Sequence, residues 1–360
     1  GGGTASFTME GGTISGCKVS SAYHVYGGGV CVEVAQGSTG TANFIMQGGS
    51  ITGCKAASGG LTGSPSGGGV CVKNGATFNM TGGSITGCKA VINDNAGNPE
   101  AQGGGVHIDE HSTFNMSGTS SITGCTAESS DSGPGGSPSF NGGGVYVYGY
   151  GDLKGKLNMI GGSIEGNGAG KEGSNYYGSG GGVYIDGGTF TMTGGEIKTN
   201  NAKNGGGVCI YGGTFEMTGG SVSLNEAKDV PQASGGGVYV GGGTFAMGER
   251  ATVTPSTGEN ADKPRENDVY LNSTTKIKVD GTLTPQGGIA ARITPDSYMA
   301  AIQVLTGSAV GTEHAKFTVT PQDLGNDKIS YWEANDQGRL MRIVDGAKAL
   351  PWKQLKDAVE

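Results

Sequence analysis

Charged residues are scarce in this chain. They make up 15% of the 360 residues, and no arginine occurs before Arg250. The formal net charge of −8 provides no positive surface to attract a phosphate backbone, so we expect no binding to nucleic acid. No apolar run reaches the roughly 18 residues that a membrane-spanning helix needs, so we expect no membrane span in this fragment.

Apolar residues are also few, at 34%, whereas 76 residues are glycine. The glycines show no strict three-residue period, which excludes a collagen-like chain. With random spacing, this composition would be typical of a chain that cannot bury enough apolar surface to fold. The fold class therefore depends on whether the glycines are periodic.

The glycines do recur, in a long repeat. Each repeat begins with GGGV, continues as T-F-x-M-x-G-G-S-I, and places Cys or Asn three residues after its last apolar position. The shortest repeat spans 25 residues, and insertions fall mostly before the next GGGV. The GGGV blocks end at Val30, Val70, Val106, Val145, Val183, Val208 and Val238.

Each repeat contains three short runs in which apolar and polar residues alternate. In 205–229 these runs are Val208–Ile210, Phe215–Met217 and Ser221–Ser223. Alternation predicts β-strands with apolar side chains on one face. Three strands that recur in the same order predict an all-β, right-handed, single-stranded parallel β-helix with three strands per coil. We expect about eight coils over residues 1–260.

The pattern GGGV-(Y/C)-V … G-T-F-x-M-x-G-G-x-I resembles the repeats of bacterial cell-surface proteins with a right-handed parallel β-helix. These belong to the pectin-lyase-like superfamily, and the resemblance is to its adhesin type rather than its enzyme type. It covers about residues 1–260 and implies an extracellular protein, secreted or on the bacterial surface. Because this architecture carries lyases, hydrolases, adhesins and spacers, it identifies the fold more than the function.

The composition changes after residue 260, since only 8 of the 76 glycines lie in 261–360. Strand-like runs continue, so we predict that 261–345 is a β-rich C-terminal cap over the open edge of the last coil. Residues 346–360 have helical spacing and are either a terminal helix or the start of a following module. Because the chain begins in the middle of a coil, we expect a fragment of a longer protein. We also expect a monomer.

The seven cysteines fall in two columns of the repeat, and an odd number cannot all pair. Stacked Asn at the Cys/Asn corner would form an amide ladder, and we expect Cys there to be a free, buried thiol. Cys31, Cys71 and His107 occupy three successive rungs. Side chains on adjacent rungs lie side by side and do not converge on a tetrahedron, so we expect no metal and no cofactor. The Cys/Asn positions are Cys17, Cys54, Cys88, Cys125, Asn167, Asn200, Asn225 and Asn260.

Five tyrosines are the candidate ligand-binding residues. The valine of each GGGV block points inward, so the residue after it, and the residue two further on, point outward. Aromatic side chains exposed on a rigid sheet can stack on sugar rings. The alternative is that tyrosine is an ordinary strand-surface residue packed by its neighbours. The five are Tyr146, Tyr148, Tyr184, Tyr211 and Tyr239.

Catalysis requires groups that the coils supply sparsely. A polysaccharide lyase needs a basic residue, and Lys73 is isolated among the coils. A glycoside hydrolase needs paired carboxylates, and coils separate Asp109 from Asp186. We therefore predict a non-catalytic module for adhesion, for binding of glycans or host surface molecules, or for display. The alternatives are a polysaccharide-active lyase or hydrolase, and a purely structural stalk.

Overall fold

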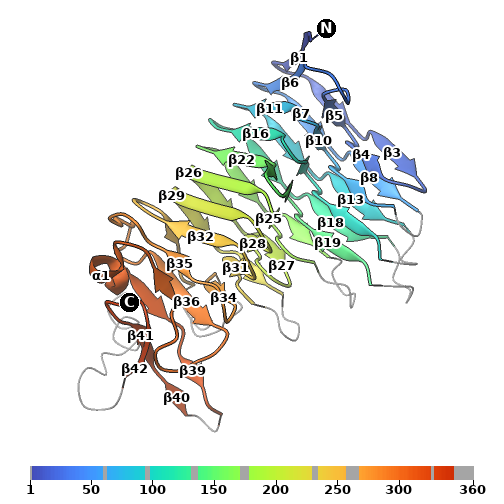
Figure 1. Cartoon of the computed structure of the whole chain (residues 1–360). Helices are drawn as coiled ribbons and strands as arrows, with labels where there is room; N and C mark the ends of the chain where they lie inside the picture. Colours follow the sequence, from blue (N-terminus) through green and yellow to red (C-terminus); the bar gives the residue numbers. More distant parts are fainter. Residues whose placement is uncertain are drawn as a thin grey trace.

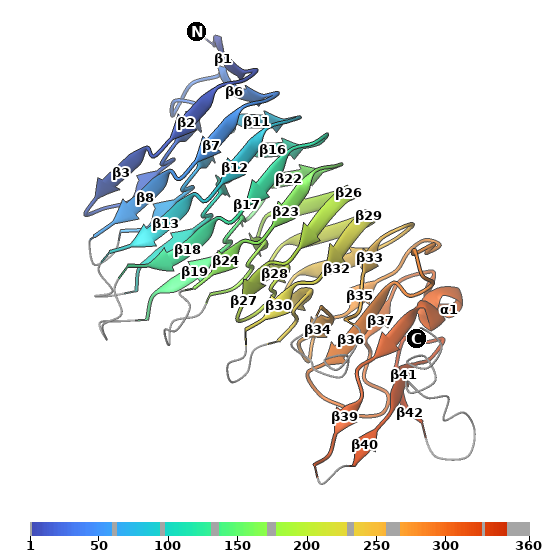
Figure 2. The same cartoon turned by 180° about the vertical axis from the view of Figure 1, so that it is seen from behind.

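The computed structural model describes residues 2–59, 63–93, 98–130, 137–170, 178–228, 234–256, 267–325 and 328–343. Nearly all of the regular structure is β, and equivalent strands of successive repeats pair in parallel. Figures 1 and 2 show these strands stacked from the N-terminal coil to the C-terminal hairpins. The predicted all-β parallel β-helix is confirmed.

The strands that begin at the valines of the GGGV blocks belong to an 11-stranded sheet, here named the GGGV sheet. Its rungs are in register, so that Val70 pairs with both Val30 and Val106. One strand, β21 (Leu153–Lys154), instead forms an antiparallel hairpin with the end of β20. The parallel strands are β5 (Val30–Glu33), β10 (Val70–Lys73), β15 (Val106–Ile108), β20 (Val145–Tyr150), β25 (Val183–Asp186), β28 (Val208–Ile210), β31 (Val238–Val240), β34 (Val269–Leu271), β36 (Ala291–Pro295) and β38 (Phe317–Val319).

The other two predicted columns belong to one 16-stranded sheet, because β26 and β29 run through both columns without a break. The F-x-M column contains β1 (Thr4–Met9), β6 (Thr41–Met46), β11 (Thr77–Met80), β16 (Thr113–Met116), β22 (Lys156–Met159), β26 (Thr189–Lys198), β29 (Thr214–Ser223), β32 (Thr244–Met247), β35 (Ile277–Lys278) and β37 (Leu305–Thr306). The column after the GG pair contains β2 (Thr13–Ser15), β7 (Ser50–Thr52), β12 (Ser84–Thr86), β17 (Ser121–Thr123), β23 (Ser163–Glu165) and β33 (Thr252–Val253).

The structure also contains two columns that the repeat pattern did not predict. They use the variable segments between the Cys/Asn corner and the next GGGV, which are long enough in the early coils to pair with each other. The corner sheet contains β3 (Lys18–Ser21), β8 (Lys55–Ser58), β13 (Lys89–Ile92), β18 (Thr126–Ser129), β24 (Gly168–Ala169), β27 (Asn201–Ala202) and β30 (Glu226–Ala227). The entry sheet contains β4 (Val25–Tyr26), β9 (Pro65–Ser66), β14 (Glu100–Gln102) and β19 (Ser139–Asn141).

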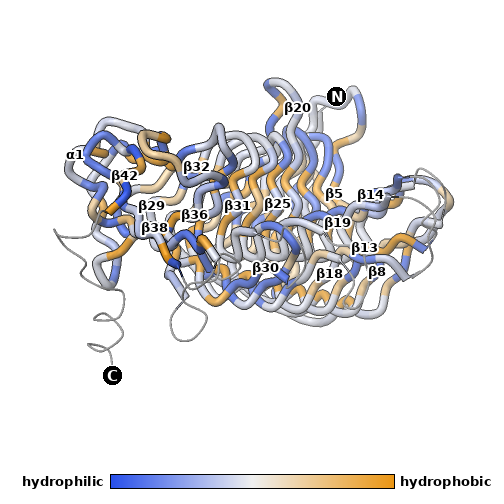
Figure 3. Tube along the Cα trace, turned by 90° about the horizontal axis from the view of Figure 1, so that it is seen from below, coloured by the Kyte–Doolittle hydropathy of each residue, from blue (hydrophilic) through white to orange (hydrophobic). Residues whose placement is uncertain are grey.

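One continuous core fills the coils. The Phe of each F-x-M strand stacks on the Phe of the next, with ring centroids 4.8 Å apart for Phe44 and Phe78 and 4.6 Å apart for Phe78 and Phe114. Leu157 takes the place of Phe between Phe114 and Phe190. Figure 3 shows the same apolar positions recurring from coil to coil. Because each rung repeats the side chains of the last, the core grows with every coil.

The glycines of the GGGV block allow two backbones to approach closely. A Cβ at Gly104 would overlap the carbonyl oxygen of Thr126 in β18. Any side chain there would have to push the GGGV corner away from the corner sheet.

Gly104→Ala is therefore expected to lower the free energy of unfolding by about 2 kcal/mol, the typical cost of overpacking a tight site. Thermal unfolding followed by circular dichroism measures it. The matched control is Gly281→Ala, because a Cβ at exposed Gly281 meets no atom within 4 Å. An equal loss of stability in both variants would contradict the close-approach explanation.

Parallel pairing continues past residue 260, where the composition changes. Strands β34, β36 and β38 extend the GGGV sheet, because Val269, Ile293 and Val319 pair in register and maintain its inward apolar positions. The hairpin of β41 (Trp332–Ala334) and β42 (Leu340–Arg342) then packs on β38, the last strand of that sheet. The remaining elements are α1 (Val310–Glu313), the 3-10 turn His314–Lys316, β39 (Gln322–Asp323) and β40 (Ile329–Ser330). The predicted terminal helix at 346–360 lies outside the described residues.

The predicted amide ladder is confirmed at the Cys/Asn corner. In each pair, the Asn Nδ2 donates to the Oδ1 of the next Asn at 3.0 Å, and all four side chains are buried. The last position was predicted wrongly, because it comes later in the sequence than the repeat suggests. Asn267 fills it, whereas Asn260 lies outside the described residues. The ladder contains Asn167, Asn200, Asn225 and Asn267.

Candidate functional site

The outward face of the GGGV sheet carries all five predicted tyrosines, but it buries two of them. Tyr146 is 1% exposed and Tyr184 is 7% exposed, and their rings stack 5.4 Å apart. With Cys209 they form a small apolar cluster, against which Tyr148 and Tyr239 pack. The expectation of five open aromatic faces is therefore wrong for Tyr146 and Tyr184, which offer no free ring to a ligand.

Tertiary packing explains the burial of Tyr146. The Tyr146 hydroxyl donates a hydrogen bond to Asp186 Oδ2 at 2.9 Å and accepts one from Gln102 Nε2 of β14 at 3.4 Å. The entry sheet thus reaches the outward face of β20. Burial and the adjacent Asp186 carboxylate raise the pKa of Tyr146, so it remains a neutral hydrogen-bond donor.

A second outward row of the GGGV sheet, two residues further along each strand, stays accessible. Tyr148 and Asp186 are half-buried on adjacent rungs, and Tyr211, which follows β28, is 66% exposed. The Tyr211 ring lies 6.3 Å from that of Tyr184. We name Tyr148, Asp186 and Tyr211 the aromatic–acid row. In the order of the rungs, Asp186 lies between the two tyrosines, and its Oδ2 accepts the hydrogen bond from Tyr146.

Tyr239 follows a different pattern. It stacks on Tyr270 with ring centroids 5.2 Å apart, and both rings are half-buried. The Tyr270 hydroxyl donates to Asp296 Oδ1 at 2.6 Å. Sequence reasoning missed Tyr270, although the D-V-Y-L run over Asp268–Leu271 has the same apolar–polar alternation as the GGGV strands.

The same outward column holds two thiols and an imidazole near the N-terminal end. Cys71 pairs in register with Cys31 on one side and His107 on the other. Within the described residues, no group of three or more His, Cys, Asp or Glu side chains is arranged to hold a metal ion. All seven cysteines are free thiols, five of them buried and two, Cys17 and Cys31, exposed. At the Cys/Asn corner, the prediction of a buried thiol therefore holds for Cys54, Cys88 and Cys125 and is wrong for Cys17.

His107 should make stability depend on pH. Burial lowers its pKa from 6.5 to about 4, with nearby Lys73 contributing and Asp109 opposing. Between these values the unfolded chain binds a proton that the folded chain does not, so stability falls as pH drops from 6.5 to 4. We expect a loss of about 2.5 kcal/mol across this range.

The measurement is urea unfolding of the wild type and of His107→Tyr at pH 4.5 and pH 7. Tyrosine occupies the same position in the next rung, where Tyr146 pairs with His107, so the substituted ring should fit. Burial raises the pKa of Asp268 to about 7, so this group also titrates in the range, but it does so in both proteins. Its contribution therefore cancels when the pH-dependent change in unfolding free energy of the variant is subtracted from that of the wild type. The same pH dependence in both proteins would contradict the role given to His107.

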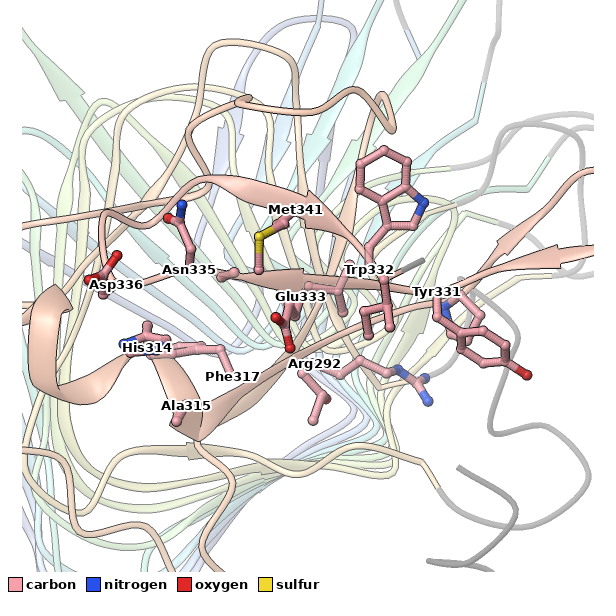
Figure 4. A pocket seen from close by; sticks show the side chains of 15 residues that line it. Arg292, His314, Ala315, Phe317, Tyr331, Trp332, Glu333, Asn335, Asp336 and Met341 are labelled. Atoms are coloured by element: carbon pink, nitrogen blue, oxygen red, sulfur yellow. The ribbon is translucent and has the colours of Figure 1, made fainter. Parts of the chain in front are cut away.

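The C-terminal end contains a cavity of about 640 Å³ between β38 and the β41–β42 hairpin. Figure 4 shows the side chains of Arg292, Tyr331, Trp332 and Glu333 around it. No pattern in the sequence indicated this cavity, because its walls come together only when the hairpin packs on the last rung.

The chemistry of this cavity does not select one ligand charge. Arg292 and His314 line it together with Glu333 and Asp336, so an anionic ligand would meet two carboxylates and a cationic ligand would meet the guanidinium. The aromatic–acid row is therefore the better-defined candidate site.

No protein-family model matches the chain, and searches of curated proteins and of solved structures find no significant match. The resemblance to bacterial surface repeats therefore stays a prediction. Among the described residues, no helix is both long and apolar enough to cross a membrane.

Proposed function

We propose that this chain is a non-catalytic, extracellular β-helix module of a bacterial surface protein. In this proposal it binds carbohydrate through the aromatic–acid row. The observation that carries the proposal is Tyr211, a largely exposed aromatic ring held on a rigid sheet near Asp186. Sugars are bound in this way, with an aromatic face under the ring and a carboxylate that accepts hydrogen bonds from its hydroxyl groups.

The spacing of the row supports an extended ligand. Tyr148 and Tyr211 belong to rungs that are two apart, which places them about 10 Å from each other along the stack. Asp186 lies between them, and its hydrogen bond from Tyr146 fixes the carboxylate before any ligand arrives. A preorganised acceptor loses little conformational entropy on binding, so an oligosaccharide chain along the stack suits this row better than a compact ligand.

The test is a glycan array followed by affinity electrophoresis in polysaccharide-containing gels. Tyr211→Ala and Asp186→Asn should each weaken retardation by about tenfold in apparent Kd, the usual cost of removing one stacking ring or one charged hydrogen bond. The matched control is Tyr150→Ala, which removes a tyrosine that is 72% exposed but lies on the β20–β21 hairpin, beyond the row.

Two results would overturn the proposal. Equal retardation of the wild type and Tyr211→Ala would show that any binding occurs elsewhere. Release of reducing sugar or unsaturated uronate from a polysaccharide panel would establish a polysaccharide-active enzyme instead.

A structural stalk is the second candidate, and the continuous core favours it. The same Phe and Met positions are buried in rung after rung, from Phe44 to Met247, which makes the coils a stiff rod. A stalk predicts an elongated monomer in sedimentation velocity and no retardation by any polysaccharide. The carbohydrate proposal predicts the same shape but specific retardation.

A further inference from the structure

The outward column that holds the aromatic–acid row has a second carboxylate on the preceding rung. Asp109 and Tyr148 come directly after Ile108 and Val147, which are register partners. Asp109 therefore lies on the same outward face as Tyr148, and Asp186 pairs with Tyr148 on the other side. Both carboxylate side chains are partly accessible. Tyr148 is thus flanked by two carboxylates, each one rung away at about 4.8 Å per rung.

The hydrogen bonds that hold these two carboxylates come from neutral groups. Asp109 Oδ1 accepts the backbone N–H of Glu110 at 2.9 Å, and Asp186 Oδ2 accepts the Tyr146 hydroxyl at 2.9 Å. Among the residues that the structure describes, neither carboxylate forms an ion pair with a lysine, arginine or histidine. Neutral donors orient a carboxylate but leave its charge in place, so both are available to a cation.

A lysine in the same outward column has a partner of its own. Lys73 comes directly after Val72, the register partner of Ile108, and so lies one rung from Asp109. Its ammonium lies over the ring of Tyr26 in the entry sheet, 3.4 Å from the ring centroid. This cation–π contact holds the ammonium at the entry sheet.

The surroundings of Tyr148 are therefore negative. Burial raises the pKa of the Tyr148 hydroxyl, and the carboxylates of Asp186, Glu110 and Asp109 raise it further. Three carboxylates that act on one aromatic side chain create a local negative potential, which attracts cations and repels anions.

We infer that the aromatic–acid row, together with Asp109, selects oligosaccharides that carry free amino groups, such as oligomers of glucosamine. This inference rests on the carbohydrate proposal and names its ligand class. An ammonium group is attracted by a carboxylate and by the face of an aromatic ring, and the row offers both on adjacent rungs. A uronate or a sulfated sugar would meet like charge at Asp109 and Asp186, so the row disfavours acidic glycans.

The experiment compares glucosamine oligomers with N-acetylglucosamine oligomers of the same length by isothermal titration calorimetry on the full chain. It is done at about pH 5.5, where the amino groups of the ligand are protonated. We expect the glucosamine oligomers to bind at least about tenfold more tightly at low ionic strength. This advantage should shrink as salt is added, because the attraction is between partly exposed charges.

One substitution separates charge selection from stacking. Asp109→Asn should lower the ratio of the two Kd values by about fivefold, the upper range for one partly exposed ion pair. Tyr211→Ala should weaken the binding of both oligomers. The matched control is Glu216→Gln, which removes an exposed carboxylate from β29 of the 16-stranded sheet and should leave the ratio unchanged. Circular dichroism checks that each variant is folded.

The outcomes distinguish this inference from the carbohydrate proposal. Equal Kd values for the two oligomers, both raised by Tyr211→Ala, would overturn the amino-sugar inference and support the carbohydrate proposal. Binding of neither oligomer nor any other glycan would overturn both. Oligolysine that binds as tightly as the glucosamine oligomers, and is insensitive to Tyr211→Ala, would overturn the inference too, because the row would then attract any polycation.

Discussion

Phe78→Ala is expected to lower the free energy of unfolding by about 4 kcal/mol, because it opens a cavity in a core that cannot collapse around it. The Phe78 ring is fully buried and stacks between those of Phe44 and Phe114. Both neighbours are fixed by in-register pairing, so neither can move into the space without breaking its own rung. Urea unfolding measured by intrinsic fluorescence and circular dichroism gives the midpoint shift.

The end of the same stack supplies the control. Phe7 stacks on Phe44 with ring centroids 5.4 Å apart, but it is 53% exposed because no ring covers its other face. Phe7→Ala should therefore cost less than about 1 kcal/mol. Phe78→Leu should recover most of the loss, since Leu157 already occupies the equivalent position in a later rung. Similar losses for Phe78→Ala and Phe7→Ala would show that burial does not set the cost.

Asn200→Ala is expected to lower the free energy of unfolding by about 3–4 kcal/mol, because it leaves two buried backbone groups without partners. Its Oδ1 accepts a hydrogen bond from the backbone N–H of Asn167 at 2.9 Å. Its Nδ2 donates to the carbonyl oxygen of Ile164 at 2.9 Å. Neither group can reach water in the folded coil, so each loses the full value of its hydrogen bond. Urea midpoints and hydrogen exchange at Asn167 measure the effect.

A second Asn ladder, on the outer surface of the F-x-M strands, separates burial from hydrogen bonding. Asn115 Nδ2 donates to Asn79 Oδ1 at 2.8 Å, and Asn115 Oδ1 accepts from Asn158 Nδ2 at 2.8 Å. These amides are partly exposed, and within the described part of the chain their side chains bond only to each other, so water replaces the lost partners. Asn115→Ala should cost below about 1 kcal/mol. A cost equal to that of Asn200→Ala would contradict the argument from burial.

Much of the fold could be predicted because each repeat carries the same apolar–polar alternation and the same glycine positions. The alternation in Val208–Ile210 assigns the inward face, and glycine at fixed positions marks the corners. The corner and entry sheets could not be predicted in the same way. Their residues, such as Lys89–Ile92 and Glu100–Gln102, lie in segments of variable length, and they become strands only because the coils before and after present an edge to pair with.

The candidate site was predicted less well than the fold. Alternation correctly placed Tyr146, Tyr184 and Tyr211 outside the coil interior. It could not show that Gln102 of the entry sheet would pack on Tyr146, or that Tyr184 would be buried in a cluster with Tyr146 and Cys209. It also gave no sign of the cavity beside Arg292, whose walls are separated by tens of residues in the sequence.

The sequence by itself determined the parallel stack, the inward Phe, Met and Val columns and the Asn ladder, because these follow from a period that each coil repeats. Tertiary structure alone decided which outward residues remain accessible. Exposure depends on what segments without a period pack against, which explains why Tyr146 is buried while Tyr211 is open.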